Sequence, residues 1–189
     1  MVAGIAASDI TSGPRSLMDK ISPSEGDDAR SIRAEGTISG NPIINNIMPA
    51  KTGQSINGHL MHYTSAALIK RDGKILMIDR KIFPFGFACL AGHIEEGETP
   101  EEALEREVAE ESGLKIIRSK KIFEEEIDGN VCSRSVSVHY WHVYECECEG
   151  EPALFTLEEK SIGWYSPEEI KTMTLESIWE YWFKKLNII

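Results

Sequence analysis

Acidic side chains are concentrated between Glu95 and Glu111, where nine glutamates share a short stretch with a single arginine, Arg106. Glu107, Glu110 and Glu111 are spaced i, i+3 and i+4, which places them on one face of a helix. Carboxylates on a partly buried face need cations, because burying an unpaired charge is very costly. Mg²⁺ and Mn²⁺ prefer oxygen ligands and bind phosphates together with carboxylates. The stretch therefore predicts a metal platform for phosphate chemistry.

The helix that must carry these glutamates has clear boundary signals. Thr99 and Glu102 form a capping-box pattern. Pro100 occupies the first helical position and Gly113 supplies the stop, so we expect a helix from about Pro100 to Ser112. Glutamates in its last turn face the negative end of the helix dipole and repel one another. A bound cation would offset that repulsion.

Part of the glutamate run needs no ligand. A charge run is usually a solvated face, and this interpretation accounts for Glu101, Glu102 and Glu105. The side of the helical wheel that holds Glu102, Glu105, Ala109 and Ser112 is expected to face solvent. Only the three glutamates of the opposite arc require the metal interpretation.

The segment from Gly92 to Leu114 resembles the signature of the Nudix hydrolases. That signature is glycine, five residues, glutamate, seven residues, then Arg-Glu-U-x-Glu-Glu-x-Gly-U, where U is aliphatic. Every defined position matches in this chain: Gly92, Glu98, Arg106, Glu107, Val108, Glu110, Glu111, Gly113 and Leu114. The resemblance implies the Nudix fold of the α/β class, a mixed β-sheet sandwiched between helices (α/β/α).

The resemblance also implies site roles. Glu107, Glu110 and Glu111 would be metal ligands for Mg²⁺ or Mn²⁺, with the carbonyl of Gly92 as a further ligand. Arg106 would orient a catalytic glutamate.

The remaining catalytic roles are less uniform in this family. Glu98 would pair with Arg106 and brace the loop onto the helix, and a purely bracing role for both is the alternative. The general base varies between a glutamate of the signature, such as Glu107 or Glu110, and one from a later loop. Glu159, with its neighbour Glu158, is the candidate of the second kind.

The implied function is hydrolysis of a nucleoside triphosphate, including a modified one, by metal-activated water attack at phosphorus. A hydrolase of a nucleoside diphosphate conjugate, such as ADP-ribose, NADH or a dinucleoside polyphosphate, is the alternative. The Ser-Gln-Pro-Trp-Pro-Phe-Pro signature of NADH-cleaving members is absent, and Asn130 stands where ADP-ribose-cleaving members carry proline. A non-catalytic nucleotide sensor is less favoured. Isomerase chemistry of the isopentenyl diphosphate type would need a further cysteine and histidine ligands, and only Cys89 and His93 lie near the right region.

Candidate substrate contacts flank the signature. Phe85 and Phe87, in the stretch KIFPFGF, could form a wall for a nucleobase, although packing is the simpler role for each. His93 could contact a phosphate, and a plain loop histidine is the alternative.

Composition limits the partners. The net charge of −11 argues against a nucleic acid or an anionic membrane as the main partner. No apolar run approaches a membrane span, and the first residues do not form a secretory signal. The four cysteines form no Cys-x-x-Cys pair, so we expect free thiols in a cytoplasmic protein.

Aromatic residues divide the chain into an extension and a domain. All 15 Phe, Trp and Tyr residues lie at Tyr63 or beyond. Residues 1–58 are therefore expected to be an irregular or partly ordered N-terminal extension, and residues 59–189 the Nudix domain. The extension could be a tail, an arm packed on the domain or a homodimer contact, and its composition leaves these three open.

Patterning within the domain predicts the elements around the helix. HYTSAALI and KILMIDR should be strands joined at Arg71–Gly73, and FACLAG a short strand that leads to Gly92. LKIIRSKKIFEEEI and VCSRSVSVHYWHVYECE should form a long antiparallel pair that turns at Asp128–Asn130. SIGWYSP should be a strand, and SPEEIKTM should begin a helix at Ser166. TLESIWEYWFKKL should be an amphipathic helix whose Ile178, Trp179 and Trp182 belong to the core or to an interface rather than to a substrate site.

Overall fold

The computed structural model describes residues 49–189, so most of the predicted extension 1–58 lies outside the described residues. The elements are β1 (Thr52–Gln54), β2 (Leu60–Arg71), β3 (Lys74–Arg80), β4 (Gly86–Ala88), β5 (Leu90–His93), α1 (Pro100–Ser112), β6 (Lys115–Ile127), β7 (Val138–Glu149), β8 (Glu159–Tyr165), α2 (Pro167–Ile170) and α3 (Ser177–Lys185). The short strand β1, inside the predicted extension, pairs antiparallel with β2.

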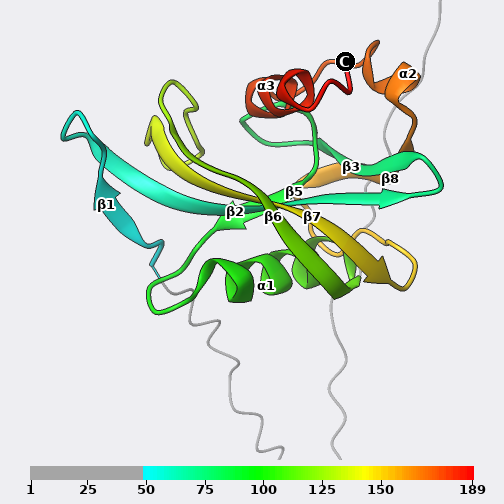
Figure 1. The fold of residues 1–189 in the computed structure, drawn as a ribbon, viewed down its shortest axis with the longest axis horizontal. Coiled ribbons are helices and arrows are strands. Elements are labelled where there is room, and N and C mark those ends of the chain that lie inside the picture. Colours follow the sequence, from blue (N-terminus) through cyan, green and yellow to red (C-terminus); the bar gives the residue numbers. More distant parts are fainter. Residues whose placement is uncertain (1–48) are drawn as a thin grey trace, which may run out of the picture. The chain divides into compact units, whose positions relative to one another are not determined.

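A mixed β-sheet forms the centre of the domain, as the sequence predicts. The path β4-β3-β2-β7-β6 has β2 at its centre, and β1, β5 and β8 pair with β2 or β3 beside it. The β2–β7 pair is parallel, whereas the other strand pairs are antiparallel. Helix α1 covers one side of the sheet and α3 the other (Figure 1). The α/β/α sandwich is therefore confirmed.

Helix α1 begins and ends where its signals predict. Thr99 accepts a hydrogen bond from the backbone of Glu102, whose side chain bonds back to the Thr99 backbone. Gly113 has φ of 69°, a left-handed conformation in which glycine carries little strain. One prediction for this helix is wrong: Ser112 is fully buried, and its hydroxyl donates to the carbonyl oxygen of Val108. The last turn is covered by the following chain, where the Ala153 amide bonds to the carbonyl oxygen of Ser112.

The first hairpin is confirmed, and its turn has a physical cause. Asp72 and Gly73 have φ values of 51° and 75°, the conformation that the tight turns of twisted hairpins require.

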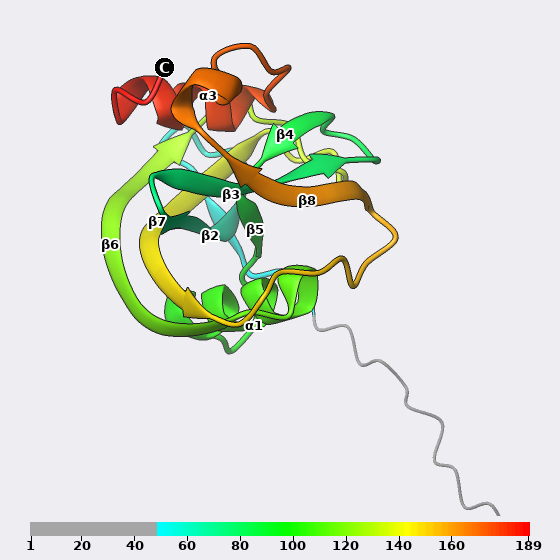
Figure 2. The ribbon, with the colours of Figure 1, turned by 90° about the vertical axis from the view of Figure 1, so that its right-hand side faces the viewer.

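The predicted long antiparallel pair is correct for β6 and for most of β7. Residues 131–137 form a turn-rich loop instead of extending β7, and Ser135 has a positive φ of 61°. FACLAG is split at Cys89 into β4 and β5. Both β6 and β7 curve strongly around the core (Figure 2), and two register shifts in their pairing accompany that bend.

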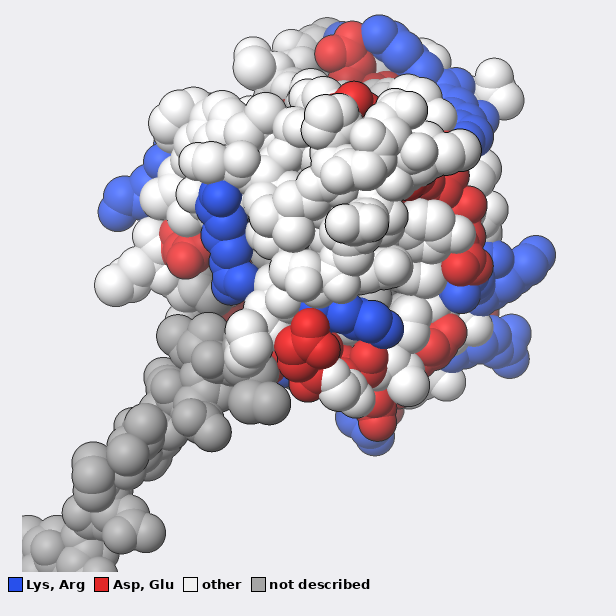
Figure 3. Space-filling model, turned by 90° about the vertical axis from the view of Figure 1, so that its left-hand side faces the viewer, with Lys and Arg blue, Asp and Glu red and all other residues white. Residues whose placement is uncertain are grey.

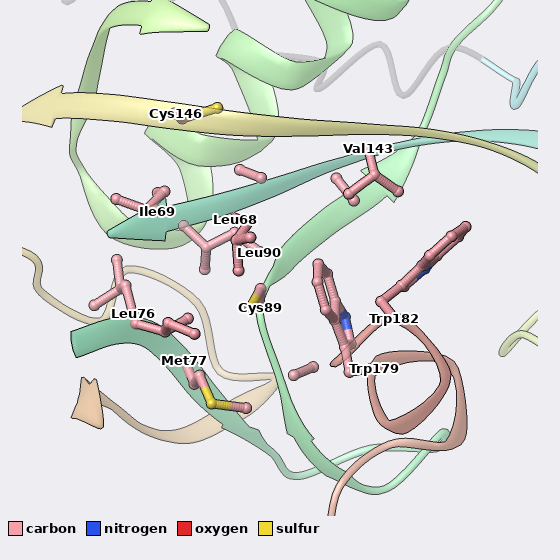
Figure 4. Packing of buried hydrophobic residues seen from close by; sticks show 14 of the residues in the cluster. Leu68, Ile69, Leu76, Met77, Cys89, Leu90, Val143, Cys146, Trp179 and Trp182 are labelled. Atoms are coloured by element: carbon pink, nitrogen blue, oxygen red, sulfur yellow. The ribbon is translucent and has the colours of Figure 1, made fainter. Parts of the chain in front are cut away.

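The hydrophobic core joins the sheet to both α1 and α3, and Leu104 and Val108 are the members from α1. Trp179, Trp182 and Phe183 of α3 are fully buried. In the close view of the core, Trp179 and Trp182 lie beside Val143 and Cys89 (Figure 4). Of the two roles predicted for the apolar residues of the last helix, core or interface, the structure shows the core.

On the face drawn in Figure 3, basic and acidic groups border a broad area without charged side chains.

None of the helices within residues 49–189 combines the length and apolarity needed to cross a membrane.

Trp179→Ala should lower the free energy of unfolding by about 3–5 kcal/mol, because it removes a buried indole and leaves a cavity. Urea denaturation followed by circular dichroism measures the change. Glu180→Ala, at the exposed next position, is the control and should stay within about 0.5 kcal/mol of the unmodified protein. Equal effects of the two substitutions would contradict the placement of α3 on the core.

Candidate active site

The carboxylate of Glu107 lies directly against the backbone of Gly92 in β5. A Cβ atom added to Gly92 would come within 1.9 Å of the Glu107 carboxyl group, so no other residue fits there without a shift. The close approach brings the Gly92 backbone and the Glu107 carboxylate into one small space. Burial raises the pKa of Glu107 even though Arg106 opposes the shift.

Arg106 holds this arrangement together with charged hydrogen bonds. Its Nε and Nη2 donate to the two carboxylate oxygens of Glu98 at 2.7 and 2.9 Å, a bidentate pair. Its Nη1 donates to Oε1 of Glu107 at 2.7 Å, and its Nη2 donates to the carbonyl oxygen of His93 at 3.0 Å. The Arg106 hydrogen bonds lower the pKa of Glu98. One guanidinium thus joins β5, α1 and the loop between them.

Glu111 is the most enclosed carboxylate of the helix. Its Oε2 accepts a hydrogen bond from the Ala91 amide at 3.2 Å. Burial raises the pKa of Glu111 well above its ordinary value, and the nearby charges of Glu107 and Glu159 raise it further. A bound cation would reverse this penalty, because it favours the ionised carboxylate. Two enclosed carboxylates beside a glycine backbone form an oxygen-rich donor set that suits a hard divalent ion.

Glu110 is placed differently from its two partners in the predicted arc. Its side chain is 60% exposed, and its Oε2 lies 3.4 Å from Nη1 of Arg106. Glu107 and Glu111 line a cavity, whereas Glu110 does not. Glu110 could therefore reach a shared ion only from the solvent side of Glu107.

A cavity of about 250 Å³ opens beside these carboxylates. β5 and α1 supply one part of its wall, and the loop between β6 and β7 supplies another. Charged, histidine, cysteine and glycine residues that line the cavity include Arg80, Gly92, His93, Glu107, Glu111, Cys132, Arg134, His139, Glu158 and Glu176. The cavity thus places carboxylates near two arginines, which is a suitable environment for a metal-bound phosphate.

The sequence predictions did not include Arg80, Arg134 or Glu176. Arg80 ends β3, and its Nε lies 3.8 Å from Oε2 of Glu176. Burial raises the pKa of Glu176 to about 7, and Arg80 opposes the shift. Arg134 belongs to the loop that the sequence assigns to a strand. No local spacing connects these residues with the glutamate helix, because different segments bring them to the cavity.

The predicted substrate contacts divide into two groups. His93 lines the cavity, whereas Phe85 and Phe87 do not. Phe85 is 62% exposed, and Phe87 packs edge-on against Tyr165 with ring centroids 5.4 Å apart. Pro84 is the member of the KIFPFGF stretch that reaches the cavity wall. Phe87 therefore packs against Tyr165 and Phe85 lies at the surface, and neither forms a wall of the cavity.

The two candidate bases occupy different environments. Glu158 lines the cavity and is exposed, whereas Glu159 begins β8 and is buried. The carboxylate of Glu159 accepts a hydrogen bond from the hydroxyl of Thr156. Its charge also acts on Glu111. Glu159 is therefore close to the carboxylate end of the site without belonging to the cavity lining.

Comparisons with known proteins agree with this geometry. A family model of the NUDIX domain matches residues 61–185. CTP pyrophosphohydrolase of Escherichia coli (strain K12) is 32% identical over 109 residues, which cover 55% of this chain and 75% of that protein. The crystal structure of MutT NUDIX hydrolase from Burkholderia pseudomallei matches with a TM-score of 0.52 and 25% identity, covering 58% of this chain and 85% of that one.

A stronger but shorter match is confined to one segment. NAD-capped RNA hydrolase NUDT12 of Homo sapiens is 57% identical over 51 residues, which are 26% of this chain. The matched region spans only 11% of the length of that relative.

Glu176→Gln should change how stability depends on pH in the metal-free protein. Because burial raises the pKa of Glu176 from 4.5 to about 7, its stabilising contribution is complete below about pH 4.5 and is lost as pH rises through 7. The loss amounts to about 3 kcal/mol at roughly 1.4 kcal/mol per pKa unit. Urea denaturation between pH 5 and 8 in EDTA should therefore show a smaller decline for Glu176→Gln. The exposed Glu180→Gln is the control, and equal declines for both variants would refute the assignment.

Proposed function

This chain belongs to the NUDIX family, and we propose that it is a pyrophosphohydrolase that cleaves nucleoside triphosphates with a divalent cation. One observation supports the proposal above all others. Glu107 and Glu111 converge beside Gly92 on a cavity whose wall also contains Arg80 and Arg134. Carboxylates for a metal and guanidinium groups for phosphates therefore meet in one place.

The described residues fit a hard divalent ion such as Mg²⁺ or Mn²⁺. Glu107, Glu111 and the Gly92 carbonyl would hold it, and Glu110 would contribute from the exposed side. When bound, the ion supplies charge that screens the polyphosphate and lowers the pKa of an attacking water. Its binding would also relieve the repulsion between the buried carboxylates.

The remaining residues position the reactants. Arg106 fixes the Glu107 carboxylate through its Nη1, and Glu98 fixes Arg106 in turn. Arg80 and Arg134 would bind phosphate oxygens from the cavity wall. In the reaction, the water oxygen forms a bond to phosphorus as the bridging P–O bond breaks, and the leaving phosphate carries away the electron pair.

We assign the proton of that water to Glu159. Its burial and its electrostatic contact with Glu111 favour it over the exposed Glu158. Because Glu159 does not line the cavity, this role requires its side chain to come within hydrogen-bond reach of the water.

A nucleoside triphosphate is the substrate class that we favour. CTP pyrophosphohydrolase aligns over 75% of its own length, whereas the match with the NAD-capped RNA hydrolase covers 11% of that protein. Conjugates such as ADP-ribose, NADH and dinucleoside polyphosphates form the alternative class.

The protein should hydrolyse at least one nucleoside triphosphate in Mg²⁺, and Glu107→Gln or Glu110→Gln should lower kcat by about 10²–10³-fold. Loss of a carboxylate ligand removes part of the several kcal/mol that the metal contributes to the transition state, at about 1.4 kcal/mol per tenfold change. Chromatography of the products from triphosphates, ADP-ribose, NADH and dinucleoside polyphosphates measures the activity and the substrate class.

Glu105→Gln, on the exposed side of the same helix, is the matched control and should retain full activity. Turnover of conjugates alone would replace the triphosphate assignment. Nucleotide binding without turnover of any compound would refute the hydrolase proposal in favour of a sensor.

Glu159→Gln should lower kcat by about 10²–10⁴-fold with little change in KM, because a general base acts mainly in the transition state. Glu158→Gln, at the neighbouring position, should change kcat by less than about tenfold. Steady-state kinetics of the two variants at saturating Mg²⁺ distinguish the roles. The reverse order of effects would transfer the base to Glu158.

A further inference from the structure

Three histidines project from the neighbouring strands β2, β5 and β7 beside the cavity, and two of them, His93 and His139, line it. His62 in β2 is the register partner of His139 in β7, and His93 in β5 pairs with Thr64. Because Thr64 lies two residues after His62, the three imidazoles share one face of the sheet. Their ring centroids are 4.8, 5.6 and 5.7 Å apart.

A cysteine completes the cluster from the loop between β6 and β7. The Sγ atom of Cys132 lies 3.7 Å from Nδ1 of His62. The loop is held by hydrogen bonds from the Cys132 amide to the Val136 carbonyl oxygen and from the Ser135 amide to the Cys132 carbonyl oxygen. This cysteine is therefore presented by an ordered turn.

The spacing of the four side chains suits a tetrahedral metal ion. One ligand atom from each residue lies within 4.8 Å of the other three. Bonds of about 2.0–2.1 Å to nitrogen and 2.3 Å to sulfur place neighbouring ligand atoms roughly 3.4–3.7 Å apart. The Cys132–His62 pair already lies near this separation, and side-chain rotations could bring the others closer.

The cluster also contains buried polar atoms that lack protein partners. His139 is only 1% exposed, and neither of its ring nitrogens has a hydrogen-bond partner among the described residues. Buried polar side chains are usually paired. A metal ion would provide a partner for one nitrogen of His139.

We propose that His62, His93, His139 and Cys132 bind Zn²⁺ at a second metal site, separate from the glutamates of α1. Imidazole and thiolate ligands favour zinc and similar transition metals, whereas carboxylate and carbonyl oxygens favour Mg²⁺. The two sites on one cavity would therefore select different ions. Zinc binding would release the thiol proton of Cys132 to solvent.

The second site would act on the shape of the cavity. Four protein ligands close the coordination sphere, which is typical of structural zinc. The ion would fasten the loop to three strands of the sheet. Because this loop also supplies Arg134 to the cavity wall, zinc would fix the position of a proposed phosphate-binding side chain.

Cobalt binding tests this proposal without any measurement of hydrolysis. The full chain is treated with EDTA, dialysed, and titrated with Co²⁺ in excess Mg²⁺, which would occupy the carboxylate site. One equivalent of Co²⁺ should give visible bands of tetrahedral geometry and a near-ultraviolet thiolate-to-cobalt charge-transfer band. Zn²⁺ should then displace the cobalt and remove both signals.

The variants identify the ligands. Cys132→Ser should abolish the charge-transfer band and weaken Co²⁺ binding at least about tenfold, and His62→Gln should weaken binding similarly. Cys148→Ser, a half-buried cysteine outside the cluster, and Glu107→Gln are controls that should keep the full spectrum. Circular dichroism verifies that each variant is folded.

Two outcomes would overturn the proposal. The first is Co²⁺ binding without a thiolate band in the unmodified protein. The second is a spectrum that survives in folded Cys132→Ser.

Discussion

The site depends first on the charged hydrogen bonds of Arg106. This side chain reaches four separate groups: the carboxylates of Glu98, Glu107 and Glu110 and the carbonyl oxygen of His93. Without it, the carboxylates of the loop and the helix would repel one another in a partly buried place. With it, the Glu107 carboxylate is held against Gly92, and the helix is fixed relative to β5, the strand that carries Gly92.

The sequence predicted those features that depend on residues close to one another along the chain. The boundaries of α1 follow from Thr99, Pro100 and Gly113, whose effects act within one helical turn. The burial of Trp179 follows from an apolar stripe of helical period. Ser112 shows where such reasoning fails, because the chain that covers the last turn comes from a distant segment and no helical wheel can include it.

The walls of the cavity could not be predicted in the same way. Arg80 and Arg134 carry no spacing relation to the glutamates, and only the pairing of strands brings them to the same space. The alternation around residues 131–137 resembles a strand, yet the positive φ of Ser135 and the turn at Cys132 produce a loop. The sequence of residues 131–137 has the alternation of a strand. Alternation alone does not indicate whether the chain stays paired with β6.

The parallel pairing of β2 and β7 has a consequence for how the site comes into being. Paired residues of the two strands, such as Met61 and Val138, lie far apart along the chain. Bringing them together costs loop-closure entropy before the contacts between the strands can stabilise the pair. A nascent chain that has emerged only as far as Leu114 contains every glutamate between Glu95 and Glu111 but neither the loop of Arg134 nor the strand of His139. The glutamates of α1 are thus synthesised before the strands and loops that complete the cavity around them.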